Sequence, residues 1–283
     1  MASKSARRKF FKSQSRSILY RDWLTHVFAF LIVGSMSFGF RQFGASISIL
    51  SQELTDNVFI TALLFSIFLV LEFVFFIPVL IGYMYFEQRC LERGKASLSD
   101  LFYAFENTYD FTRSYKITLY ASLNSIIYFM PSILLDYFLK NIYHEGIFNI
   151  QSSFYGKDAV YFILSVILII FTSAGFVLST KNLMGIYVCL IRHDTEISKC
   201  FFIANLCISQ SKRELAMLTL SFLPLALLSL FTLGFLFIMY TIPYIAICLT
   251  MFCKYLYDKE MYCGNIKKVL YSQNQTDNNP ERK

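Results

Sequence analysis

The sequence is poor in charged residues and in the side chains that most often carry catalysis. Only 16% of its residues are charged, whereas 56% are hydrophobic, and this balance is typical of integral membrane proteins. It contains no Gly-rich phosphate loop, no nucleophile motif and no His-Glu-x-x-His segment. The sequence therefore predicts no catalytic site, and we expect a protein that is not an enzyme.

The few His and Cys residues form no metal-binding pattern. The three His residues, His26, His144 and His193, fall at different depths or on different sides of the predicted topology, so they cannot share one ion. Cys200 and Cys207 are spaced as on one apolar helix face, which indicates packing. We expect no metal site and no cofactor.

Long apolar runs fill most of the chain. Because about 20 apolar residues cross a bilayer, we expect six transmembrane helices, four of them near residues 24–40, 59–86, 117–139 and 159–180 and two between 215 and 257. The last two are predicted to join near Tyr240. The polar segments 41–58 and 140–158 are the predicted outer loops, and the fourth apolar run is interrupted at residues 179–182.

The distribution of basic residues predicts the orientation. Of the 26 Lys and Arg residues, all but Arg41, Lys140, Lys157 and Lys181 fall in segments on one predicted side. The positive-inside rule then places both termini in the cytoplasm of a multi-pass cell-membrane protein. This rule also accounts for the net charge of +7, so we expect no nucleic-acid partner. The polar segment 258–283 is predicted to be a disordered cytoplasmic tail.

Two segments of the sequence match at an offset of 99 residues. The match pairs Cys90-Leu91-Glu92-Arg93 with Cys189-Leu190-Ile191-Arg192 and continues into two amphipathic stripes. The first stripe contains Leu98, Leu101, Phe102, Phe105 and Tyr109, and the second contains Ile197, Cys200, Phe201 and Ala204. Such spacing predicts a helix with one apolar face, and Ser97 with Asp100 predicts a capping box.

The repeat predicts an all-α, polytopic membrane helix bundle with interfacial amphipathic helices. Residues 1–257 form one membrane domain of three parallel helix-hairpin repeats, about 6–86, 97–191 and 196–257. Residues 1–23 begin the first unit, where basic side chains and apolar side chains occupy different faces of a predicted helix. This pattern favours contact with anionic lipid headgroups at the inner face of the bilayer.

The last unit resembles a known family. Residues 218–222 (Leu-Thr-Leu-Ser-Phe), 232–234 (Thr-Leu-Gly) and the pair Pro243-Tyr244 are similar to a family of uncharacterised bacterial integral membrane proteins, mostly from Firmicutes. That family is similar to the membrane domain attached to some glycerophosphodiester phosphodiesterases. Its usual Gly-Lys pair is Ser211-Lys212 here. The resemblance implies a membrane fold and no established catalytic residues.

Four residues are candidates for ligand or proton binding. Glu72 lies within the second predicted span, where a carboxylate is costly and marks a functional position. It is predicted to pair with Lys181 or to line a cavity, and packing by hydrogen bonds is the alternative. Arg93 and Arg192 recur in the repeat just inside the membrane, either as anchors to lipid phosphate or as a headgroup-binding clamp.

These features predict a transporter, a permease-like protein or a lipid-handling component of the membrane. The alternative is a membrane scaffold or subunit that transports nothing and recruits a membrane or cytoplasmic protein through its interfacial helices. In both cases the lipid bilayer is the predicted partner. Hydropathy predicts class and topology, whereas cargo depends on a site.

Overall fold

The described part of the chain is all-helical, as predicted. The computed structural model describes residues 4–55, 58–95, 97–145, 154–209, 211–232, 234–264 and 266. Its ten α-helices in these ranges are α1 (Lys4–Arg21), α2 (Trp23–Thr55), α3 (Val58–Arg93), α4 (Thr108–Glu145), α5 (Phe154–Ser179), α6 (Lys181–Ile191), α7 (Ile197–Ser209), α8 (Lys212–Leu220), α9 (Leu223–Phe231) and α10 (Ile242–Tyr262). The 3-10 helix η1 (Leu98–Phe105) and the π-helix η2 (Phe237–Thr241) complete them. The predicted disordered tail is wrong over residues 258–262, because α10 continues to Tyr262, and most of the remaining tail lies outside the described residues.

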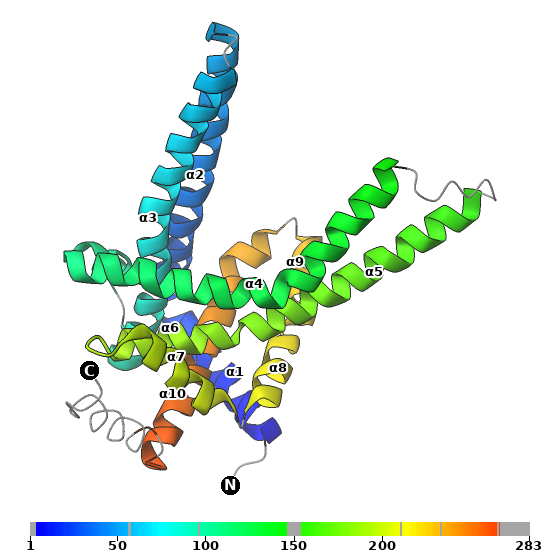
Figure 1. The fold of residues 1–283 in the computed structure, drawn as a ribbon. Coiled ribbons are helices and arrows are strands. Elements are labelled where there is room, and N and C mark those ends of the chain that lie inside the picture. The colour runs from blue at the N-terminus through cyan, green and yellow to red at the C-terminus, as the bar shows by residue number, and fades with distance from the viewer. Residues whose placement is uncertain are drawn as a thin grey trace, which may run out of the picture.

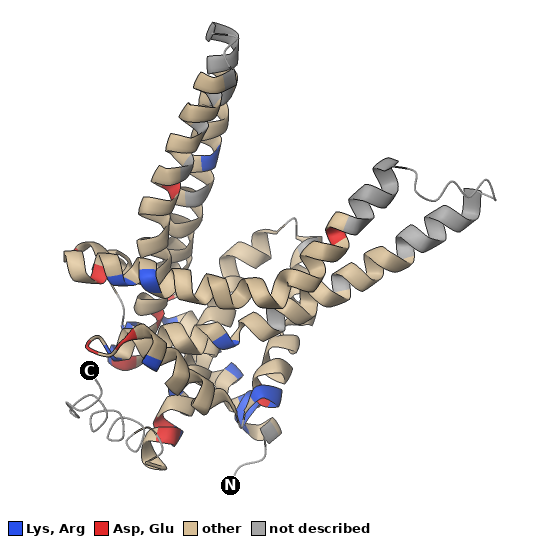
Figure 2. Ribbon diagram, in the orientation of Figure 1, with Lys and Arg blue, Asp and Glu red and all other residues tan. Residues whose placement is uncertain are grey.

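The helices form a base from which hairpins extend (Figure 1). α2 and α3 run side by side as one long arm, and α4 and α5 form a second arm that diverges from the first. α9 returns through η2 into α10 as a shorter hairpin, while α1, α6 and α7 lie in the base. Charged residues are concentrated in the base and are few in the described parts of the arms (Figure 2). This distribution fits arms that lie in lipid, where charged side chains are costly.

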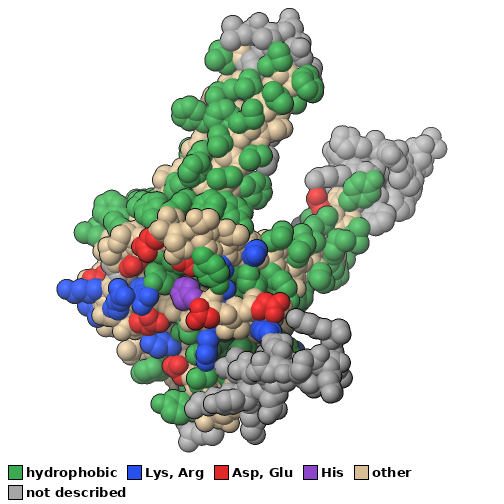
Figure 3. All heavy atoms as spheres, turned by 60° about the vertical axis from the view of Figure 1, so that its left-hand side comes forward, with side chains coloured by type: hydrophobic (Ala, Val, Ile, Leu, Met, Phe, Trp, Pro, Cys, Tyr) green, Lys and Arg blue, Asp and Glu red, His purple; other side chains and the backbone are tan. Residues whose placement is uncertain are grey.

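Four helices contain stretches that are long and apolar enough to cross a membrane. These stretches are Trp23–Ile47, Ala62–Arg93, Thr108–Tyr137 and Phe237–Tyr262. In the first three, 24% or less of the most apolar window is buried within the protein. On the face shown in Figure 3, apolar side chains cover most of the described parts of both arms. Helix length, composition and exposure therefore support a multi-pass membrane protein.

The predicted outer loop 41–58 is wrong over its described part, because α2 continues to Thr55. The described arm remains paired in this region, where the rings of Phe43 and Phe68 stack with centroids 6.5 Å apart. Contact between the two helices stabilises helical structure in a segment whose polar residues had favoured a loop.

The fourth apolar run breaks where the sequence predicts it. α5 ends at Ser179 and α6 begins at Lys181. The fifth predicted span also divides, which the sequence analysis did not predict. α8 ends at Leu220 and α9 begins at Leu223, with Pro224 in its first turn, where the missing N–H of a proline is tolerated.

The turn of the last hairpin lies earlier than predicted. Tyr240 belongs to η2, so the predicted join near this residue is wrong. Thr232 and Gly234 both lie in turns between α9 and η2. Gly234 has a φ of 82°, a conformation that glycine adopts without the steric cost of a side chain.

Helix η1 confirms the predicted capping box and changes the predicted stripe. Ser97 Oγ accepts a hydrogen bond from the backbone N–H of Ser99 at 3.4 Å, and Asp100 Oδ2 accepts one from the Ser97 N–H at 2.9 Å. Because a 3-10 helix has three residues per turn, Leu101 and Ala104 share the buried face. Phe102, which was predicted on that face, is instead 41% exposed.

We expect Ser97→Ala to lower the free energy of unfolding by about 1 kcal/mol, because it removes the side-chain acceptor at the start of η1. The measurement is thermal unfolding of the detergent-purified protein. Ser209→Ala is the control, because its hydroxyl bonds only the nearby Leu206 carbonyl at an exposed position. Equal melting temperatures for the two variants would contradict a capping role.

The predicted buried face of α7 is confirmed. Cys200, Phe201 and Ala204 are buried, and Ile197 packs against the same core. Gly185 of α6 faces this helix, and a Cβ at that position would overlap the Phe201 ring. Glycine therefore allows α6 and α7 to approach closely in the base.

Candidate functional site

Glu72 lies on α3 and pairs with a cation of its own arm. Arg41 Nε of α2 donates a hydrogen bond to Glu72 Oε1 at 3.2 Å, and the Glu72 side chain is 16% exposed. Both residues line a cavity of about 580 Å³ with aromatic walls that include Phe40 and Phe68. A ligand or proton role for Glu72 remains a prediction.

Lys181 does not meet Glu72, so the predicted pair is wrong. Its Nζ lies 4.4 Å from the centroid of the Tyr128 ring on α4, a cation–π contact. The next residue holds the same two helices together, since Asn182 Nδ2 donates to Ser125 Oγ at 2.8 Å. Lys181 therefore lies at a junction between α6 and α4.

The two recurring arginines have different surroundings. Arg192 Nε donates a hydrogen bond to the Tyr257 hydroxyl of α10 at 2.8 Å, so this guanidinium links the end of α6 to the last helix. Arg93 is exposed at the end of α3. The structure thus gives Arg192 a packing contact, while headgroup binding by Arg93 remains a prediction.

A buried polar cluster on α2 and α3 was missed by the sequence analysis. His26 Nδ1 lies 3.2 Å from Glu87 Oε1, and His26 Nε2 lies 3.5 Å from Cys90 Sγ. His26 and Glu87 are fully buried and Cys90 is 2% exposed. The order thiol, imidazole and carboxylate matches a nucleophile with a base and an orienting group, but burial excludes a reactant in this conformation. The cluster therefore acts in packing.

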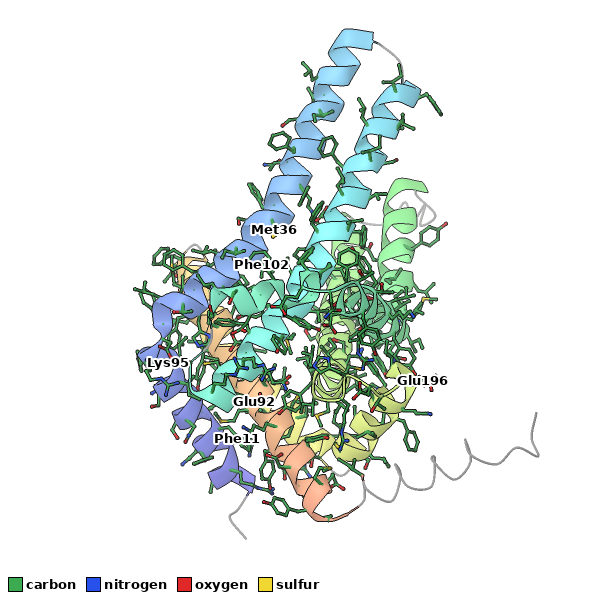
Figure 4. All side chains as sticks on the ribbon, turned by 90° about the vertical axis from the view of Figure 1, so that its left-hand side faces the viewer. Phe11, Met36, Glu92, Lys95, Phe102 and Glu196 are labelled. Carbon is green, nitrogen blue, oxygen red and sulfur yellow. The ribbon has the colours of Figure 1, made fainter. Side chains whose placement is uncertain are left out.

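α1 packs part of its apolar face against the protein, with Phe11 and Leu19 buried and Phe10 exposed. Phe11 is buried, and its ring centroid lies 5.8 Å from that of Phe252 and 5.4 Å from that of Tyr255, both on α10. Figure 4 shows Phe11 between α1 and α10 at the base. Arg7 holds the same end of the helix by an ion pair with Glu214 of α8 at 3.0 Å. α1 therefore packs across the last hairpin.

This packing leaves a groove beside the basic face of α1. The groove has a volume of about 500 Å³ and is lined by three basic residues of α1, Lys9, Lys12 and Arg16, and by Ser221, Phe222, Pro224, Leu225, Leu228, Tyr240 and Tyr244 among others. None of the described lining residues is acidic. We call it the α1 groove. Its basic side and apolar wall match the two ends of an anionic lipid.

Lys12 lies at the break between α8 and α9. Its Nζ donates a hydrogen bond to the Ser221 carbonyl at 3.1 Å and lies 5.0 Å from the Phe222 ring centroid. The break thus exposes a carbonyl that a continuous helix would use internally. Burial lowers the pKa of Lys12, and an anion in the groove would favour its charged form.

The chain matches no family model, no curated protein and no solved structure. Its function must therefore be inferred from its own geometry.

The local sequence predicted the basic side of the α1 groove but not its apolar wall. Basic residues on one face of residues 1–23 predicted an anionic partner, and Lys12 and Arg16 do lie in the groove. The wall comes from residues more than 200 positions away, including Phe222 and Tyr244. Near the break between α8 and α9, the sequence has a proline, Pro224. A proline does not predict which helix packs over such a break.

Proposed function

We propose that the protein is a multi-pass membrane protein that binds anionic phospholipids in the α1 groove and handles them at the membrane. The observation that carries this function is the juxtaposition of Lys12 and Arg16 with apolar side chains such as Leu225 and Leu228. Basic residues near a bilayer attract anionic headgroups, and apolar side chains accept the adjoining part of an acyl chain.

The proposed membrane topology has six crossings in three hairpins. The hairpins are α2 with α3, α4 with α5, and the broken pair α8–α9 with α10. A shorter helix precedes each one: α1, η1 and α7. The base is cytoplasmic in this proposal because it holds most of the Lys and Arg residues.

The family resemblance agrees with this choice of site. Three of its residues, Ser221, Phe222 and Tyr244, line the α1 groove. We therefore place the shared function of the resembling proteins, as a proposal, at this break and not at the arms.

Burial of the α7 stripe favours lipid handling over recruitment of a partner through that helix. Leu101, Cys200 and Ala204 were expected on interfacial faces open to a partner, but each is buried in the protein, whereas Phe102 and Phe105 of η1 are exposed. A scaffold role would need other surfaces of the base.

We expect Lys9→Gln/Arg16→Gln to weaken binding of phosphatidylglycerol roughly 30-fold, since each basic residue contributes about 1 kcal/mol to anionic lipid binding. Native mass spectrometry of detergent-purified protein, titrated with phosphatidylglycerol, measures this change. Lys12 stays unchanged in this test because its contact with Ser221 also supports the fold.

Arg93→Gln/Lys95→Gln is the matched control, because it removes the same charge from exposed positions at the end of α3. Figure 4 shows Lys95 at the base, beyond α3. Retained binding in this control and lost binding in the groove variant would support the proposal. Loss of phosphatidylglycerol binding in the Arg93→Gln/Lys95→Gln variant alone would contradict the proposal. It would indicate that the headgroup binds at Arg93 instead.

A further inference from the structure

A second cavity in the base lies between the start of α4 and the amino end of α7. Its volume is about 450 Å³. Arg113 and Lys116 line it from α4, and Ile197 and Ser198 line it from the first turn of α7. None of the residues of the α1 groove takes part in it.

Arg113 is the buried basic residue of this cavity. It is 7% exposed, and its Nη2 donates hydrogen bonds to the carbonyls of Arg192 at 2.8 Å and Thr195 at 2.9 Å. These bonds fix the guanidinium against the loop before α7. Its Nε has no hydrogen-bond partner among the described residues. Nη1 donates to the Tyr109 hydroxyl at 3.0 Å, so Arg113 offers a ligand in the cavity its positive charge and the second N–H of Nη1.

Three positive contributions meet at the cavity. Lys116 lies one turn after Arg113 on α4 and is exposed. The amino end of α7 adds the partial positive charge of a helix N-terminus. The Ser198 hydroxyl supplies a neutral donor along the lining, whereas the Tyr109 hydroxyl already donates to the His193 carbonyl at 2.8 Å.

One acid also lines the cavity, but its charge is partly compensated. Glu196 Oε2 lies 3.6 Å from Lys199 Nζ, and the Glu196 side chain is 65% exposed. Figure 4 shows Glu196 at the periphery of the base, on the side away from Lys95. With Arg113 and Lys116 facing it, the lining favours an anion over a cation.

We propose that this cavity binds a phosphoryl group, with Arg113, Lys116 and the amino end of α7 as its donors. Phosphate offers several acceptor oxygens to these groups at once. The group belongs either to a lipid headgroup with a terminal phosphate or to free phosphate. This site is independent of the α1 groove, so either site can fail without the other.

The test uses Lys116→Gln, which removes an exposed charge and leaves the Arg113 contacts intact. It is made in the Lys9→Gln/Arg16→Gln protein, so that the α1 groove does not contribute. Inorganic phosphate is titrated and followed by phosphorus NMR line width, and phosphatidic acid is titrated and followed by native mass spectrometry. Glu196→Gln and Lys95→Gln are made in the same background.

We expect Lys116→Gln to weaken binding roughly fivefold, Glu196→Gln to strengthen it, and Lys95→Gln to leave it unchanged. If Lys116→Gln weakens binding of phosphatidic acid alone, the ligand is a lipid headgroup. If it weakens binding of inorganic phosphate, the ligand is free phosphate. Absence of binding of both probes, or equal binding with and without Lys116, would overturn the proposal.

Discussion

Gly82→Ala is expected to destabilise the protein by about 3 kcal/mol, because overpacking a close contact forces the backbone to move. Gly82 lies on α3 where η1 crosses it, and a Cβ there would overlap the carbonyl oxygen of Leu101. That oxygen belongs to the backbone, so it cannot move aside by a change of side-chain rotamer. Leu101 itself is fully buried, so η1 cannot move away without exposing its apolar face.

The experiment compares melting temperatures in detergent for Gly82→Ala and Gly39→Ala. Gly39 is in α2 of the same arm, and a Cβ at this position meets nothing within 4 Å. The control is expected to be neutral or slightly more stable, because alanine favours helix over glycine by about 1 kcal/mol. Similar loss of stability in both variants would show that the close approach of α3 and η1 is absent in solution.

Glu87→Ala is expected to cost about 3–5 kcal/mol, the typical effect of breaking a buried ionic pair. It leaves His26 buried without its acceptor and removes volume beside Phe86, whose ring centroid lies 5.2 Å from that of His26. The free energy of unfolding is compared with that of His26→Leu/Glu87→Leu. The double variant is expected to recover part of the loss, because it removes both buried polar groups.

Glu92→Gln is the control for this prediction. Glu92 also pairs with a cation on α3, since Arg89 Nη1 lies 3.3 Å from Glu92 Oε2. That pair is partly exposed, and exposed pairs contribute about 0–1 kcal/mol. A loss for Glu87→Ala no larger than that for Glu92→Gln would mean that water reaches the His26 cluster.

Sequence periodicity predicted the helices better than it predicted the contacts between them. The stripe on α7 was correct because an α-helix repeats its face every 3.6 residues, and Cys200 and Ala204 obey that period. The stripe on η1 failed at Phe102 and Phe105, which are both exposed, because the local helix is tighter. That difference depends on contact with α3 at Gly82, which no local pattern contains.

For the candidate residues too, the sequence predicted positions better than it predicted contact partners. The ligand or proton role of Glu72 stays a prediction, but its partner was misassigned because Arg41 was expected in a loop. Arg93 and Arg192 matched in sequence, yet only Arg192 lies within reach of α10. Similar sequence segments do not give their long side chains the same partners, because each side chain bonds to the neighbour that the packed helices place beside it, as α10 does for Arg192.

The sequence by itself determined the helical class, the long apolar segments and the concentration of charge outside them, because burial in lipid restricts composition and length locally. Only the tertiary structure decided that α1 covers the break between α8 and α9, that His26 meets Glu87, and that Arg113 lies against the loop before α7. These contacts join residues 61 to 209 positions apart. Such pairings depend on how the packed helices cross, and periodicity along one helix carries no information about that crossing.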